Sequence, residues 1–233
     1  SHRSHAHYLA KGGSLKKMIS EIYGKANGCA GGKGGSMHLI DRSVGFMGSS
    51  AIVGNSIPLG VGLAMAIKLE KTNNMSVIYF GDAATEEGVF FESLNFAALH
   101  NLPALFVCEN NGYSVYSPTH VRQPRNRDNC SVASSIGLQS YKIDGNSPFE
   151  LHNILKEAVE NVKANSSPVF IESMTYRTLE HCGPNNDDYL GYRDELEILE
   201  WGTKDPIDNL VKILNLPESK INKLRENISE EID

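Results

Sequence analysis

Short apolar runs, rich in β-branched and aromatic side chains, alternate along this chain with segments whose apolar positions follow a helical period. Residues 75–80 and 103–108 form two such runs. Their length and composition predict buried strands. Between them, four apolar residues at helical spacing predict a helix: Phe90, Leu94, Ala97 and Ala98. A strand, a helix and a strand of these lengths predict a right-handed crossover between parallel strands.

The same alternation continues in the second half of the chain. Residues 138–144 and 168–174 are predicted as strands, with an amphipathic helix at residues 148–163 between them. This repeated order predicts an α/β fold class with a doubly wound parallel sheet flanked by helices. Further predictions are helices at residues 15–24, 58–68, 196–201, 206–214 and 218–228, and a polar loop at residues 113–130.

Composition narrows the class of protein. The 233 residues are enough for one large α/β domain, in which residues 193–233 are expected to form peripheral helices. The net charge is −6 and no basic run is present, so nucleic acid is excluded as an expected partner. No apolar stretch has the length of a membrane span, so no membrane partner is expected. Four scattered cysteines without a CxxC motif favour reduced thiols, as in a bacterial cytoplasm or a mitochondrial or plastid matrix.

Polar residues follow the first two predicted strands at the point where each one ends. Gly81 and Asp82 come after the first strand, and Asn111 follows the second. Open parallel sheets bind ligands at the carboxyl ends of their strands. The Asp82 carboxylate, the Asn111 amide oxygen and a backbone carbonyl near Tyr113 are oxygen donors of the kind that Mg²⁺ prefers. Because backbone N–H groups that open a helix after Gly81 would attract an anion, the sequence predicts a metal-diphosphate site.

These residues resemble a known cofactor fingerprint. Gly-Asp followed by Asn-Asn, with Asp82 and Asn111 in the key positions, is similar to the thiamine-diphosphate fingerprint. The longer order Gly-Asp…Glu-Gly…Phe-Glu-Ser-Leu-Asn…Ala-Ala…Leu-Pro…Glu-Asn-Asn-Gly-Tyr resembles the alpha subunit of the first component of 2-oxo acid dehydrogenase complexes. The resemblance implies a thiamine-diphosphate-binding fold, the cofactors thiamine diphosphate and Mg²⁺, and cofactor contacts from Gly81, Asp82, Ala83, Ala84, Asn111 and Tyr113. Ala83 departs from the family, which usually has glycine there, but it keeps the backbone N–H group.

The first ten residues carry another part of the resemblance. Taken alone they predict a polar loop or the start of a helix, and nothing nearby completes a tetrahedral metal site for their His-x-His pair. The family has Tyr-Arg-x-His here, and Arg3 and His5 match its arginine and histidine. The resemblance implies that both contact the cofactor, with a planar guanidinium suited to the diphosphate. His2 replaces the family's aromatic residue.

Two histidines are the candidate catalytic residues. The glycine-rich residues 28–35 lack the Lys-Ser/Thr end of a P-loop, so they form either a surface loop or, as the resemblance implies, an active-site loop. The family carries the Gly-Gly-Ser-Met-His that follows in this chain, and the resemblance implies that His38 lies at the mouth of the site. After the last predicted strand, Thr-Tyr-Arg…His matches the family, and the resemblance implies that His181 contacts the diphosphate. Cys182 replaces a serine that is phosphorylated in some animal members, so that regulation is not implied here.

Two further segments bear on the site. In the family, backbone atoms at the positions of Ala51 and Val53 hold the aminopyrimidine ring. Three arginines lie within the predicted loop 113–130, where they either face solvent or gate a carboxylate substrate: Arg122, Arg125 and Arg127.

The resemblance also implies what the chain lacks. The cofactor needs a glutamate at N1′, and Glu86 and Glu87 lie at the metal end instead. In the family a beta subunit supplies this residue. We therefore expect a portion of a longer alpha subunit that forms an alpha/beta heterotetramer. We expect oxidative decarboxylation of a 2-oxo acid, with pyruvate favoured, and acyl transfer to a lipoyl acyltransferase.

Three alternatives remain open on the sequence. The protein could be an acetoin dehydrogenase, or a transketolase-like thiamine enzyme acting on sugar phosphates. It could also be a non-catalytic cofactor-binding homologue. Ala83, the missing glutamate and the unusual residues 185–189 leave room for this last alternative.

Overall fold

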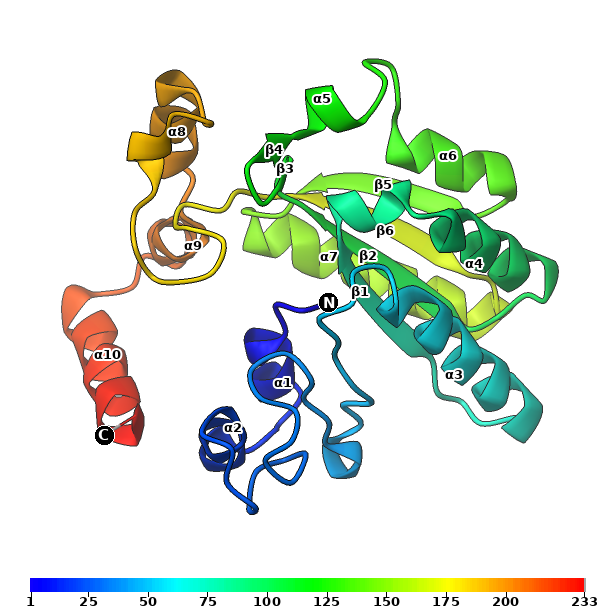
Figure 1. Cartoon of the computed structure of the whole chain (residues 1–233), viewed down its shortest axis with the longest axis horizontal. Coiled ribbons are helices and arrows are strands. Elements are labelled where there is room, and N and C mark those ends of the chain that lie inside the picture. Colours follow the sequence, from blue (N-terminus) through cyan, green and yellow to red (C-terminus); the bar gives the residue numbers. More distant parts are fainter. Residues whose placement is uncertain (233) are drawn as a thin grey trace.

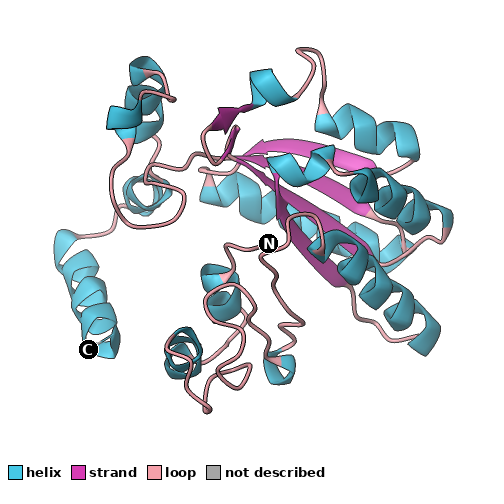
Figure 2. Ribbon diagram, in the orientation of Figure 1, coloured by secondary structure: helices cyan, strands magenta, loops and turns pink. Residues whose placement is uncertain are grey.

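A four-stranded parallel sheet forms the centre of the protein. A computed structural model describes residues 1–232. The strand order across the sheet is β1-β2-β6-β5, and every neighbouring pair is parallel (Figure 2). The strands are β1 (Ser76–Gly81), β2 (Ala104–Asn110), β5 (Gln139–Asp144) and β6 (Val169–Met174). The four strands predicted from apolar runs are confirmed, each within two residues at either end.

Helices cover both faces of this sheet (Figure 1). On one face lie α3 (Ser56–Glu70), α4 (Gly88–Leu99) and α6 (Asn129–Ile136). On the other face lies α7 (Pro148–Asn165). The chain moves across the sheet through α4 and α6 and returns from β5 to β6 through α7 on the opposite face. This reversal confirms the predicted doubly wound arrangement and is the one expected of right-handed crossovers.

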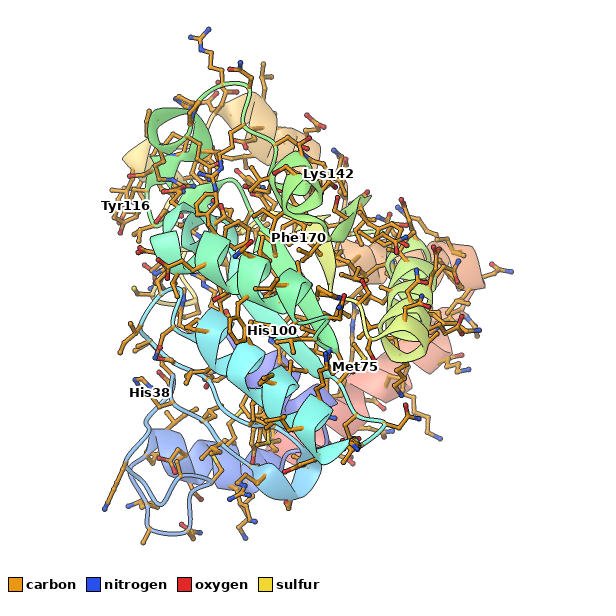
Figure 3. The ribbon with its side chains drawn as sticks, turned by 90° about the vertical axis from the view of Figure 1, so that its right-hand side faces the viewer. His38, Met75, His100, Tyr116, Lys142 and Phe170 are labelled. Atoms are coloured by element: carbon orange, nitrogen blue, oxygen red, sulfur yellow. The ribbon has the colours of Figure 1, made fainter. Side chains whose placement is uncertain are left out.

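The two central strands of the sheet, β2 and β6, are buried on both sides. All but one residue of β2 is buried, as expected for a central parallel strand. On the face of α4, the ring of Phe90 lies 5.9 Å from that of Phe80 and 6.1 Å from that of Phe170, measured between centroids. Phe170 lies in the middle of the sheet (Figure 3). Phe170→Ala would open a cavity here and cost about 3–5 kcal/mol of stability.

The strand register brings the polar segments together at the carboxyl ends of the strands. Gly81 pairs with Glu109, and Asn110 pairs with Met174. The residues that follow β1, β2 and β6 therefore leave the sheet side by side. Met75 and His100, labelled in Figure 3, lie at the opposite end of the sheet, where β1 and β2 begin.

Five further α-helices lie outside the sheet and its covering layers (Figure 1). Two precede it, α1 (His5–Ala10) and α2 (Leu15–Ile22). Three follow it, namely α8 (Glu195–Gly202), α9 (Pro206–Leu214) and α10 (Glu218–Ile232). All the helices predicted outside the alternating pattern are therefore confirmed, with small differences at their ends. Within residues 1–232, no helix is long and apolar enough to cross a membrane.

Three details differ from the sequence prediction. No α-helix begins directly after Gly81, because a 3₁₀ helix, η2 (Asp82–Glu86), and an extended Glu87 precede α4. The predicted loop 113–130 is wrong in part, because it contains β3 (Tyr113–Ser114), β4 (Ser117–Pro118) and α5 (Thr119–Arg122). Helix α6 was not predicted, since its sequence NCSVASSI has few apolar positions from which to recognise a helical period.

Candidate active site

A buried ion pair occupies the carboxyl end of β1. Asp82 is 2% exposed, and its Oδ2 lies 2.5 Å from Nη2 of Arg122. Burial raises the pKa of Asp82 above its ordinary value, and the hydrogen bond and charge of Arg122 oppose that shift. The same guanidinium also pairs with Glu86. A buried, ionised carboxylate requires a cationic partner. Asp82, which was predicted as a metal donor, therefore lies where positive charge is needed.

The end of β2 supplies neutral oxygen donors beside Asp82. The Asn111 amide oxygen accepts the backbone N–H of Tyr113 at 3.0 Å. An amide oxygen has two lone pairs, so this bond leaves one for a metal ion. Asp82, Asn111 and the Tyr113 backbone therefore come from adjoining strand ends and fit a hard cation such as Mg²⁺. Within residues 1–232, no three His, Cys, Asp or Glu side chains group into a metal site, and the proposed donor set contains only one carboxylate.

The segment around α5 is fastened over the 3₁₀ turn η2. Besides the Arg122 contacts, Gln123 Nε2 donates to Glu86 Oε1 at 2.8 Å. Arg127 donates to the Thr85 carbonyl and lies 3.2 Å from the Thr85 hydroxyl. The turn carrying Asp82 is thus held from outside by three side chains. Arg122 and Arg127 are therefore neither free in solvent nor available as an open gate.

Arg3 and His181 meet, although they are far apart in the sequence. Arg3 Nη2 donates to the His181 carbonyl at 2.7 Å and lies 2.9 Å from His181 Nδ1. Nδ1 must accept this bond, which requires the neutral imidazole. Burial lowers the pKa of His181, and the neighbouring charges of Arg3, His2 and Arg177 lower it further. These groups create a positive environment that suits a diphosphate.

His5 and the glycine-rich loop form another part of the predicted site. His5 Nε2 donates to the Ser36 carbonyl at 2.7 Å, two residues before His38. His38 itself is exposed and lies at the periphery of the molecule (Figure 3). No side-chain hydrogen bond within residues 1–232 joins His38 to Asp82, Arg3 or His181.

A fully buried carboxylate, missed by the sequence analysis, shapes the glycine-rich loop. The side chain of Glu21 on α2 accepts the backbone N–H groups of Ala30, Gly32 and Gly34 at 2.7, 2.8 and 2.6 Å. Burial would raise the pKa of Glu21, but these hydrogen bonds outweigh it and lower the pKa. At Gly28, an added Cβ would lie 2.3 Å from Glu21 Oε2. The loop is therefore wrapped around an anion of the protein itself.

The backbone positions expected to hold the aminopyrimidine lie beside α4. Ala51 is half-buried and Val53 is exposed. The next residue, Gly54, has a φ of +82°, and an added Cβ would lie in tight contact with Glu87, 3.2 Å from its Cγ. This segment therefore runs past the start of α4, near the carboxyl end of β1, which Asp82 follows. Of the small residues predicted nearby, Ala84 packs into the core and Ala83 is half-buried.

Aromatic and charged side chains attach α8 to the site. Tyr113 donates its hydroxyl to Glu197 Oε2 at 2.5 Å. Burial, followed by this hydrogen bond, raises the pKa of Tyr113. The rings of Tyr176 and Trp201 stack at 5.4 Å with an interplanar angle of 4°. In the unusual segment 185–189, Asp187 is buried and paired with Arg193. This residue therefore stabilises the loop from within and is not part of its surface.

Comparison with known proteins places this geometry in a family. Residues 1–233 match the family model described as "Dehydrogenase E1 component". The chain is 37% identical over 236 residues to the alpha subunit of acetoin:2,6-dichlorophenolindophenol oxidoreductase from Bacillus subtilis, covering all of the chain and 70% of that protein. It is 37% identical over 214 residues to the pyruvate dehydrogenase E1 component subunit alpha of Rickettsia bellii, covering 92% of the chain and 64% of that protein.

A third relative gives the same result. The pyruvate dehydrogenase E1 component subunit alpha of Zymomonas mobilis is 36% identical over 240 residues, covering 99% of the chain and 65% of that protein. The chain thus spans about two thirds of the length of these relatives. The match confirms the resemblance indicated by the residues around Asp82 and Asn111, and the chain belongs to the dehydrogenase E1 component family.

Proposed function

We propose that this chain is the alpha half of a thiamine-diphosphate- and Mg²⁺-dependent 2-oxo acid dehydrogenase. Together with a beta subunit, it would oxidatively decarboxylate a 2-oxo acid, with pyruvate favoured, and pass the acyl group to a lipoyl acyltransferase. One observation carries the proposal: Asp82 is a buried carboxylate with a cation against it, at a strand end that adjoins Asn111. Relatives named as pyruvate dehydrogenase alpha subunits favour pyruvate.

The residues of this chain would bind and orient the cofactor. Bound thiamine diphosphate would supply a carbon nucleophile and an electron sink for the loss of CO₂. Asp82, Asn111 and the Tyr113 carbonyl would hold Mg²⁺, and the pair formed by Arg3 and His181 would bind diphosphate oxygens. His181 is held neutral by its surroundings, so it could accept or donate a proton near this charge. His38 would act from the mouth of the site.

Exposed apolar side chains support a partner subunit. Helix α3 is apolar on all sides: Ile57 and Val61 are buried against the sheet, while Leu59 on another side is 59% exposed. At the end of α4, Leu99 is 71% exposed. Helices that are apolar all round are normally buried within a larger assembly. We infer that residues 1–233 form one domain that adjoins a beta subunit, which supplies the glutamate that this chain lacks.

Acetoin cleavage is the second candidate. It is supported by the identity of 37% over the whole chain to the alpha subunit of the Bacillus subtilis acetoin oxidoreductase. The donor oxygens and the Arg3–His181 pair would serve either reaction, because they lie on the part of the site that would bind cofactor.

A turnover assay with several substrates would test the proposal. The full-length alpha chain is co-produced with its beta subunit and supplied with Mg²⁺ and thiamine diphosphate. Reduction of an artificial electron acceptor is followed with pyruvate, with branched-chain 2-oxo acids and with acetoin. We expect turnover of one substrate, which would also identify it. If none of the three kinds of substrate is turned over by a complex that is shown directly to bind the cofactor, the proposal is overturned in favour of a sugar-phosphate enzyme or a non-catalytic homologue.

A further inference from the structure

Besides Asp82, a buried carboxylate on the neighbouring part of the sheet lies close to the proposed metal site. Glu172 is 1% exposed and belongs to β6, on the face of the sheet that also carries Phe170. An ionised group in the apolar interior is costly unless it is hydrogen-bonded and paired. An apolar residue would fill this position without that cost, so the contacts of Glu172 need an explanation.

Three polar side chains from three different elements surround Glu172. Its Oε1 accepts the amide N–H groups of Asn110 at 2.8 Å and Asn129 at 2.7 Å. Its Oε2 lies 3.3 Å from Nζ of Lys142, which reaches in from the edge strand β5 and is labelled in Figure 3. The carboxylate thus connects the end of β2, the start of α6 and the edge strand β5.

Only one of these contacts continues to the metal site. The Asn110 side chain donates to Glu172 and also accepts the backbone N–H of Gly112 at 2.9 Å. Gly112 has a φ of +77°, a conformation that favours glycine. Its carbonyl in turn accepts the backbone N–H and the hydroxyl of Thr119, each at 2.9 Å. Gly112 is therefore held on both sides, between the two proposed metal donors Asn111 and Tyr113.

We propose that Glu172 and Asn110 are positioning residues for the metal-binding turn. Glu172 fixes the Asn110 amide, and Asn110 fixes Gly112, so the Asn111 side chain and the Tyr113 carbonyl are presented together toward Asp82. Partners behind metal ligands orient those ligands and set affinity. The inference rests on the proposed Mg²⁺ site. It goes beyond that site because it assigns roles to two residues that are not among the proposed metal donors or cofactor contacts.

The two asparagines form a matched pair for a test. Both are buried and both donate to the same oxygen of Glu172, but only Asn110 continues to Gly112. Mg²⁺ is titrated at a fixed, saturating concentration of thiamine diphosphate onto the alpha/beta complex, and binding is followed by calorimetry. We expect Asn110→Ala to raise the half-saturating Mg²⁺ concentration about tenfold or more. We expect Asn129→Ala to lower the melting temperature but to keep the Mg²⁺ affinity within about threefold, because the path to Gly112 is intact.

Hydrogen exchange at the Gly112 amide gives a second readout that needs no cofactor. It should accelerate in Asn110→Ala and stay as in the wild type in Asn129→Ala. Asn110→Ser, with a shorter polar side chain, replaces Asn110→Ala if the latter does not fold. Equal Mg²⁺ affinities in the two alanine variants would overturn the positioning role while leaving the proposed function intact. Absence of Mg²⁺-dependent cofactor binding in the wild type would overturn both.

Discussion

Arg122 and Asp82 form an ion pair at the end of β1, with Nη2 of the arginine 2.5 Å from Oδ2 of the aspartate and both side chains largely shielded from water. The arginine comes from α5, and the aspartate is the only carboxylate among the proposed metal donors. Both the guanidinium and a metal ion satisfy the same need of a buried carboxylate for positive charge. A divalent cation at Asp82 must therefore share or replace the contact with Arg122.

Removing Arg122 should make the protein depend more on its cofactor. Without the guanidinium, Asp82 is a buried carboxylate with no cation, which costs about 3 kcal/mol of stability. We expect Arg122→Gln to lower the melting temperature of the protein without added ligand. Because Mg²⁺ can then neutralise Asp82, the rise in melting temperature on adding Mg²⁺ and thiamine diphosphate should be larger than in the wild type.

Arg125 provides the matched control for this experiment. It is exposed on the same segment and lines a neighbouring cavity of about 460 Å³. Arg125→Gln should change neither the melting temperature nor its response to cofactor by more than the effect of an ordinary surface substitution, about 0.5 kcal/mol. Equal responses to Mg²⁺ and thiamine diphosphate in the two variants would contradict the competition between Arg122 and the metal.

Asp82 should be indispensable for Mg²⁺-dependent cofactor binding. Asp82→Ala removes the only anionic group among the proposed metal donors, and Asp82→Asn keeps its volume but not its charge. We expect both variants to lose binding of thiamine diphosphate in Mg²⁺-containing buffer, measured by calorimetry on the alpha/beta complex. Glu86→Gln is the control, because Glu86 pairs with the same arginine and is not a proposed ligand. Retained Mg²⁺-dependent binding in Asp82→Ala would refute the assignment.

The sequence predicted correctly those elements whose burial is reflected directly in the type of side chain they contain. The first five residues of β2 form a continuous apolar run because both faces of the sheet are buried at this central strand, and this burial is visible in the sequence. Asp82 and Asn111 could be proposed as donors because polar residues directly after buried strands stand out. Their proximity then followed from the parallel register.

Contacts that form only when the chain folds were missed. Glu21 sits in an amphipathic helix and looks like any solvent-facing glutamate, because its partners are backbone N–H groups that no side chain encodes. Arg122 was recognised as part of a basic loop, but the contact with Asp82 spans 40 positions and has no local signal. Glu172 interrupts an apolar run, and its three polar partners become evident only when the strands are assembled. Long-range electrostatic contacts of this kind are decided by the fold.

His181 offers a measurement of anion binding. Its pKa is lowered from the ordinary value of 6.5 by burial and by the charges of Arg3, His2 and Arg177. A bound diphosphate would offset those positive charges, so the pKa of His181 should rise when thiamine diphosphate binds. Proton NMR of the ring, with His181→Gln to assign the signal, would report the change. An unchanged pKa with the cofactor demonstrably bound would place His181 away from the diphosphate.

The same pKa shift has a consequence for stability. Because the folded state holds His181 neutral, the unfolded state takes up its proton first, and stability falls as pH drops through the unfolded value of 6.5. His181→Gln should remove this part of the pH dependence and reduce turnover more than stability. If the variant instead fails to fold at neutral pH, His181 is a structural core histidine.

Glu21 should control the stability of the glycine-rich loop. Glu21→Gln keeps the size of the side chain but turns one acceptor oxygen into an N–H donor that faces loop N–H groups. Leaving a buried donor unsatisfied costs about 1–3 kcal/mol, so we expect a loss on the order of 3 kcal/mol at neutral pH. Thermal unfolding would measure it, with the exposed Glu70→Gln at the end of α3 as the matched control.

The pH dependence separates this role of Glu21 from simple packing. Hydrogen bonds to the ionised form hold the pKa of Glu21 below its ordinary value of 4.5, so the stabilisation is complete above that value and is lost as pH falls through the lower, folded pKa. The difference in stability between the wild type and Glu21→Gln should therefore be largest at neutral pH and shrink in acid, where Glu21 itself becomes protonated. A difference that stays constant from neutral pH down to acid unfolding would show that shape, and not the carboxylate charge, holds the loop.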